Sequence, residues 1–195
     1  MKFDDAINNG YFQNFPLQEA VDTKQLETAV NHFILANDTG KGQVMEINGF
    51  LENKKGDTFL APGDLYEMVG NDNEKELAGS IIARGQDMLA ENRKLLVACI
   101  GFAKEAVSSD GIKFLDPWEA TKIEPEDASS LLAVVNCCFF NYVNAFLENY
   151  HLDIEQLNPQ PMAFAYHWDC TDNEGNKQLP HVHLMFSVTD SLKEE

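Results

Sequence analysis

Apolar residues recur at helical spacing in three stretches of the chain, residues 22–40, 76–107 and 126–153. In each stretch they return every three to four positions, as on the buried face of an amphipathic helix. The third stretch is apolar on nearly all sides between residues 131 and 140. We therefore expect three helices, of which the third is the central, buried one.

The first helix has a recognisable start. Asp22 can cap its N-terminus, and Gln25, three residues later, is the partner that a capping box requires. Its apolar stripe consists of Leu26, Val30, Phe33 and Ile34. His32 lies off this stripe, so we expect it to be a surface residue.

Period-two alternation and turn residues predict the strands. Residues 42–62 are predicted to form a β-hairpin, with NKKGD as the turn. Residues 62–70 are predicted to form a short helix or turn. Further strands are expected at residues 112–115, 162–170 and 180–190. There is no internal repeat and no long linker. We therefore expect residues 1–195 to form a single α+β domain, an antiparallel sheet with helices packed on one face.

The charge of the chain is strongly negative. Fourteen basic residues against 32 acidic ones give a formal net charge of −18. After Lys122, only Lys177 and Lys193 are basic, against 12 acidic residues. Such a surface repels phosphate backbones and favours association with basic surfaces.

Composition also bears on the compartment. The first 15 residues lack the basic and apolar regions of a signal peptide, and no apolar run reaches about 18 residues. The four cysteines have no metal-type spacing, and Cys137 and Cys138 are adjacent. We expect a reduced, cytoplasmic protein without a membrane span.

The candidate chemistry lies at the end of the chain, in a hairpin that covers residues 162–189. His181 and His183 alternate on one strand, and His167 and Asp169 alternate on the preceding one. If Asp169 opposes His181, and His167 opposes His183, all four side chains share one face at roughly 5 Å spacing. The three histidines could then hold one ion, with Asp169 as a fourth ligand or as a hydrogen-bond acceptor behind one of them.

Two alternatives stay open for this hairpin. The long loop does not fix the register, and a two-residue shift would keep the face but change the partners. The histidines could also be ordinary residues on the exposed side of a hairpin that binds no metal.

The segments "HWDC" and "LPHVHLMFS" resemble the H-x-D-E and T-P-H-x-H core of plasmid mobilisation proteins, the Mob/Pre relaxases of the HUH endonuclease class. The resemblance covers about residues 139–188, a quarter of the chain. It implies a divalent ion, Mg²⁺ or Mn²⁺, bound by His167, His181 and His183, with Asp169 orienting the first of them. The ion would polarise a phosphodiester of single-stranded DNA, which a tyrosine or a histidine would attack.

The chain departs from the family pattern at several points. Cys170 stands where the family has glutamate, and the gap before the proline is longer. No tyrosine has the context of a nucleophile, and Tyr166 is expected to face away from His167. The HVH strand lies at the end of the chain, and one interpretation is that this strand inserts into the middle of the sheet.

Three functions follow as hypotheses. The first is a relaxase-like protein, active or degenerate, that binds Mn²⁺ or Mg²⁺, with Zn²⁺ as an alternative, and acts on nucleic-acid phosphodiesters. The second is a non-enzymatic, acidic protein from a phage or plasmid that mimics nucleic acid. It would inhibit a basic DNA- or RNA-handling enzyme, as anti-restriction and anti-CRISPR proteins do. The third is a metal hydrolase with a small-molecule or protein substrate.

Overall fold

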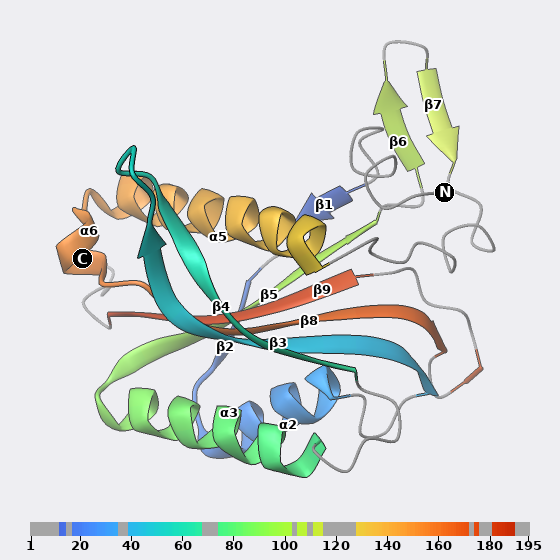
Figure 1. Cartoon of the computed structure of the whole chain (residues 1–195), viewed down its shortest axis with the longest axis horizontal. Coiled ribbons are helices and arrows are strands. Elements are labelled where there is room, and N and C mark those ends of the chain that lie inside the picture. Colours follow the sequence, from blue (N-terminus) through green and yellow to red (C-terminus); the bar gives the residue numbers. More distant parts are fainter. Residues whose placement is uncertain are drawn as a thin grey trace.

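The computed structural model contains one large antiparallel sheet with helices on both of its faces (Figure 1). The structure describes residues 12–14, 17–34, 39–67, 74–102, 105–108, 111–114, 128–171, 174–175 and 181–189.

Within these residues, seven strands form the large sheet, and every pairing in it is antiparallel. Their order across the sheet is β1, β5, β9, β8, β3, β4, and β2 pairs with β5 beside β1. The strands are β1 (Phe12–Asn14), β2 (Gln18–Ala20), β3 (Thr39–Glu52), β4 (Thr58–Glu67), β5 (Arg93–Phe102), β8 (Gln160–Thr171) and β9 (His181–Thr189). A separate two-stranded sheet joins β6 (Glu105–Ser108) and β7 (Gly111–Phe114), and its second strand confirms the one predicted at residues 112–115.

The last strand, β9, lies in the middle of the sheet, between β5 and β8. Its residues 182–188 are all buried. A strand that is paired on both sides and covered on both faces needs a continuous apolar run, which "VHLMFSV" largely provides. The interpretation that the final strand inserts into the sheet is therefore confirmed.

Two helical layers cover the sheet (Figure 1). One face packs against α5 (Ala128–Tyr150), and the other packs against α2 (Thr23–Phe33) and α3 (Glu74–Ala90). Alternation along β8 supplies both cores, because Phe164 faces α5 and Ala165 faces the other two helices. The α+β class is confirmed, although the helices occupy both faces instead of one. Helix α5 is accordingly an outer layer and not a central helix, and its Cys137 is exposed.

The start of α2 follows the sequence closely. The Asp22 side chain accepts a hydrogen bond from the Gln25 backbone N–H at 2.8 Å. In return, Gln25 Oε1 accepts one from the Val21 backbone N–H at 2.9 Å, one residue before the position in a standard capping box. The predicted cap is confirmed. The helix ends at Phe33, well before residue 40, because the chain enters β3 at Thr39.

The second predicted helix is wrong beyond residue 90. Helix α3 ends at Ala90, Asn92 adopts φ 57°, and the chain returns through the sheet as β5. The run "LLVACIGF" fits a buried strand as well as a buried helix, because a continuous apolar segment has no decisive period. Burial between two helical layers selected the strand.

The predicted hairpin is confirmed as β3 and β4, and both strands extend further than expected. In its turn, Asn53 Oδ1 accepts hydrogen bonds from the backbone N–H groups of Lys55 and Asp57, both at 2.9 Å. The helix or turn expected at residues 62–70 is wrong as far as Glu67, where β4 ends.

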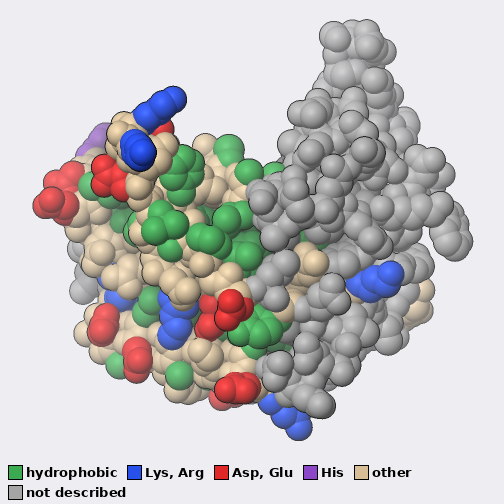
Figure 2. Space-filling view, viewed as in Figure 1, with side chains coloured by type: hydrophobic (Ala, Val, Ile, Leu, Met, Phe, Trp, Pro, Cys, Tyr) green, Lys and Arg blue, Asp and Glu red, His purple; other side chains and the backbone are tan. Residues whose placement is uncertain are grey.

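At the hairpin tip, Phe50 and Phe59 are each 41% exposed. Figure 2, seen from the same side as Figure 1, shows hydrophobic side chains gathered in the region where α5 lies.

A short capped helix, α6 (Ile154–Leu157), follows α5 and leads into β8. None of the helices in the described part of the chain is long and apolar enough to cross a membrane. Cys99, Cys137 and Cys138 are free thiols.

Candidate metal centre

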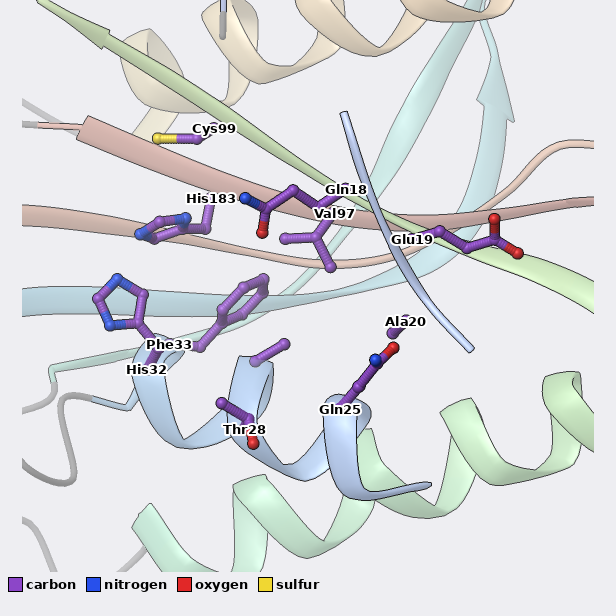
Figure 3. A pocket seen from close by; sticks show the side chains of 11 residues that line it. Gln18, Glu19, Ala20, Gln25, Thr28, His32, Phe33, Val97, Cys99 and His183 are labelled. Carbon is purple, nitrogen blue, oxygen red and sulfur yellow. The ribbon is translucent and has the colours of Figure 1, made fainter. Parts of the chain in front are cut away.

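Four imidazoles converge on the face of the sheet that α2 covers. His32 comes from the last turn of α2, His167 from β8, and His181 and His183 from β9. Each offers a ring nitrogen, and these four nitrogens all lie within 4.8 Å of one another. We call these four residues the histidine centre, and Figure 3 shows two of them, His32 and His183, approaching each other.

The register of β8 and β9 differs from the expected one by two residues. His167 pairs with His181, and Ala165 pairs with His183. Because two residues is one full period of a strand, the three histidines still share a face, and only their partners change. Asp169 lies on β8, but its side chain is outside those that the structure describes.

His183 occupies the centre of the sheet. Its neighbours across the two ladders are Cys99 on β5 and the small Ala165 on β8, and its ring stacks on Phe33 with centroids 5.6 Å apart. Its Nε2 is buried and has no hydrogen-bond partner among the described residues. A buried polar nitrogen without a partner costs about 1–3 kcal/mol. Coordination of an ion would remove that cost.

The orientation of His167 is set by the main chain of α2. Its Nε2 lies 2.8 Å from the Phe33 carbonyl oxygen, and a carbonyl can only accept, so this nitrogen donates. In the neutral ring, Nδ1 then carries the lone pair, and it lies 3.3 Å from His181 Nε2. Two nitrogens bound at about 2.05 Å to one tetrahedral ion are also about 3.3 Å apart. The spacing fits a shared ion, and it equally fits a long hydrogen bond in the metal-free protein.

His32 was missed by the sequence analysis, which expected a surface residue. Its ring centroid lies 4.6 Å from that of His183 and 5.4 Å from that of His167. The residue is off the apolar stripe of α2, yet the end of this helix lies over the sheet, so its partly exposed ring reaches the three buried or half-buried histidines. The signal available in the sequence was its position beside Phe33, the last buried residue of the helix.

Burial keeps the inner imidazoles neutral. It lowers the pKa of His167 to about 3, with a further lowering by His181 that the Phe33 carbonyl partly offsets. Burial also lowers the pKa of His183 well below its ordinary value, and the neighbouring imidazoles add to that effect. Neutral rings keep the lone pairs that bind metal, so the described arrangement could hold a metal ion. Among the described side chains, no carboxylate belongs to the centre.

Comparisons with protein-family models, with curated proteins and with solved structures gave no significant match to this chain.

Proposed function

We propose that this protein is a metalloprotein that holds one divalent transition-metal ion in the histidine centre. The observation that carries the proposal is the convergence of four ring nitrogens within 4.8 Å, one of them the buried, unpartnered Nε2 of His183. The Phe33 carbonyl behind His167 supports it, because a metal-binding histidine commonly donates its other N–H to such an acceptor.

The donor set favours Zn²⁺, or a neighbouring ion such as Co²⁺ or Ni²⁺, over Mg²⁺. Imidazole nitrogen suits the later transition metals, whereas Mg²⁺ prefers carboxylate, carbonyl and water oxygens. The resemblance to relaxases implied Mg²⁺ or Mn²⁺ with an acid behind one ligand, but the described centre is built from nitrogen alone. We therefore place Zn²⁺ first, and the Mn²⁺ and Mg²⁺ that the resemblance implied below it, because both of these ions suit oxygen ligands.

The chemistry that such an ion supplies is that of a Lewis acid, which polarises a bound oxygen or lowers the pKa of a bound water. The protein's own contribution is to hold the ligands. His181 and His183 are fixed by a strand that is paired on both sides, and the Phe33 carbonyl fixes the ring of His167.

The proposal is tested by calorimetric titration of the demetallated protein with Zn²⁺ and then with Mn²⁺. We expect stoichiometric binding of one ion, tighter for Zn²⁺, and its loss in the double variant His181→Ala/His183→Ala. His151→Asn is the matched control, because His151 is exposed, lies outside the centre, and has the left-handed φ of 52° that asparagine tolerates. Absence of binding by the wild type, or unchanged binding in the double variant, would overturn the proposal.

A second candidate is relaxase-like chemistry on nucleic-acid phosphodiesters. It is supported by the H-x-H pair on an inner antiparallel strand, with the third histidine directly paired on the neighbouring strand. Tyr166 is fully buried in the core under α5, so it faces away from the centre and is not the nucleophile. Metal-dependent nicking of single-stranded DNA that His181→Ala abolishes would support this candidate. Absence of nicking by the metal-loaded wild type would remove it while leaving the metalloprotein proposal intact.

A further inference from the structure

A cavity of about 900 Å³ opens beside the histidine centre. It lies between α2 on one side and β2 and β5 on the other, and His32 and His183 stand at one end of it (Figure 3). Cavities of a few hundred to about 1,000 Å³ are typical of sites for small organic molecules. An ion held by these histidines would therefore form part of the wall of this cavity.

The lining is almost uncharged. Among the described residues that line it there is no lysine or arginine, and Glu19 is the one carboxylate. Figure 3 shows the Glu19 carboxylate directed away from the histidines. The pairing of β2 explains this direction, because Glu19 lies opposite Leu96, whose side chain belongs to the core under α5.

The side chains that face the cavity combine apolar surface with an amide. Gln18 lies opposite Val97 on the cavity side of the sheet, and Figure 3 shows its amide extending toward His183. Val97 and Phe33 contribute apolar surface, and Thr28 contributes a hydroxyl from α2. A ligand here finds apolar contacts along its body, an amide partner at Gln18 and the ion at its end.

We infer that the cavity binds a small, uncharged organic molecule, one of whose nitrogen or oxygen atoms coordinates the ion as a fifth ligand beside the four imidazoles. The inference rests on the proposed metal centre and names the class of molecule that the centre serves. An anion would lose its hydration here and gain no cationic partner except the ion itself. A nucleic acid would in addition need basic side chains for its other phosphates, which the described lining lacks.

The test uses the full-length protein loaded with Co²⁺, whose visible absorption changes when a new ligand joins the ion. The probes are 4-phenylimidazole, which is uncharged at pH 8, and two anions, inorganic phosphate and a thymidine dinucleotide. We expect 4-phenylimidazole to change the spectrum saturably and to bind about tenfold or more tightly than either anion.

Two tryptophan substitutions at adjacent positions of β2 separate the cavity from the ion. Gln18→Trp should obstruct the part of the cavity beside His183 and weaken 4-phenylimidazole binding by about tenfold or more, with Co²⁺ binding unchanged. Glu19→Trp is the matched control, because its side chain points to the other face, and it should leave both affinities within about twofold.

The failures of the two proposals are distinguishable. If Co²⁺ binds but 4-phenylimidazole does not change the spectrum, the cavity inference is overturned and the metal centre stands. Tighter binding of phosphate or the dinucleotide, or equal effects of the two tryptophans, would also overturn the inference. If Co²⁺ itself does not bind, the metal centre falls and the cavity inference falls with it.

Discussion

The ring of His167 donates its Nε2–H to the carbonyl oxygen of Phe33 at 2.8 Å. This hydrogen bond joins β8 to the last residue of α2, and 134 residues of sequence separate its two ends. Because His32 precedes Phe33 directly, the same contact brings the fourth imidazole to the three on the sheet. The histidine centre therefore depends on how the end of α2 is placed.

Removal of His32 should weaken the metal centre without destroying the fold. His32→Ala takes away one of the four proposed ligands, so we expect Zn²⁺ affinity to fall by at least the roughly 10- to 100-fold that loss of a hydrogen-bond partner behind a ligand costs, as measured by competition with a chromophoric chelator. Asn31→Ala is the matched control, because Asn31 is the exposed neighbour on the same helical turn. Equal affinities of the wild type and His32→Ala would show that His32 is not a ligand.

The metal-free protein should lose stability in mild acid. In the fold the pKa of His167 is lowered to about 3, and that of His183 is lowered too, whereas in the unfolded chain both should titrate near 6.5. Below about pH 6.5 the unfolded chain takes up protons that the folded protein excludes. The contribution of these two neutral histidines to the free energy of unfolding is therefore fully present above that pH and declines as the pH falls toward 3. The slope is at most about 1.4 kcal/mol per pH unit for each histidine.

Urea unfolding of the protein in EDTA at pH 7.5 and pH 5.5 measures this effect. The drop in free energy of unfolding should be smaller in His183→Gln than in the wild type, because that variant lacks one of the two buried imidazoles. The comparison between variants cancels the contribution of the 32 acidic residues. The same drop in both proteins would contradict the prediction.

Two glycines of α3 should respond in opposite directions to alanine. A Cβ added at Gly85 would lie 2.6 Å from Leu26 Cδ2, and Leu26 is fully buried in α2, whereas a Cβ at Gly79 would meet nothing within 4 Å. Gly79→Ala should therefore stabilise the protein by up to about 1 kcal/mol through helix propensity. Gly85→Ala should overpack the contact between the two helices, which costs about 1–3 kcal/mol. This cost should outweigh the gain in helix propensity, so the variant should be less stable than the wild type. Thermal unfolding compares the two variants, and equal shifts would mean that α2 and α3 do not pack this closely.

Arg84 should stabilise the irregular start of β8. Its guanidinium donates hydrogen bonds to the carbonyl oxygens of Met162 and Ile47, both at 3.1 Å, beside the register shift between Pro161 and Ala163. Arg84→Met leaves these carbonyls without their charged donor, and we expect the free energy of unfolding to fall by about 2 kcal/mol or more. Urea unfolding measures the loss. Lys75→Met, at an exposed site of the same helix, should change it little, and equal losses would refute the assignment.

Local patterns were sufficient for several parts of this protein. The cap at Asp22, the extent of α5 and the turn between β3 and β4 follow from interactions between residues close in sequence. The shared face of His167, His181 and His183 was also predictable, because strand parity survives any even shift of register. The cap and the turn depend on contacts between residues close in sequence, whereas the shared face also requires that the two strands pair in an even register.

Packing between distant segments decided the rest. The run from residue 93 to residue 102 satisfied both a helical and a strand interpretation, and only burial between two helical layers made it β5. The long connection between β8 and β9 left their register open, and pairing across the sheet placed His167 opposite His181. His32 could not be assigned from its own helix, because a position off the apolar stripe faces solvent or a neighbouring element depending on where the helix docks. The sequence by itself determined which side chains share one face of a helix or strand. Only the tertiary structure decided which of these faces pack against each other, because the contacts that stabilise the packing of helices on the sheet join residues far apart in sequence, and no local pattern contains them.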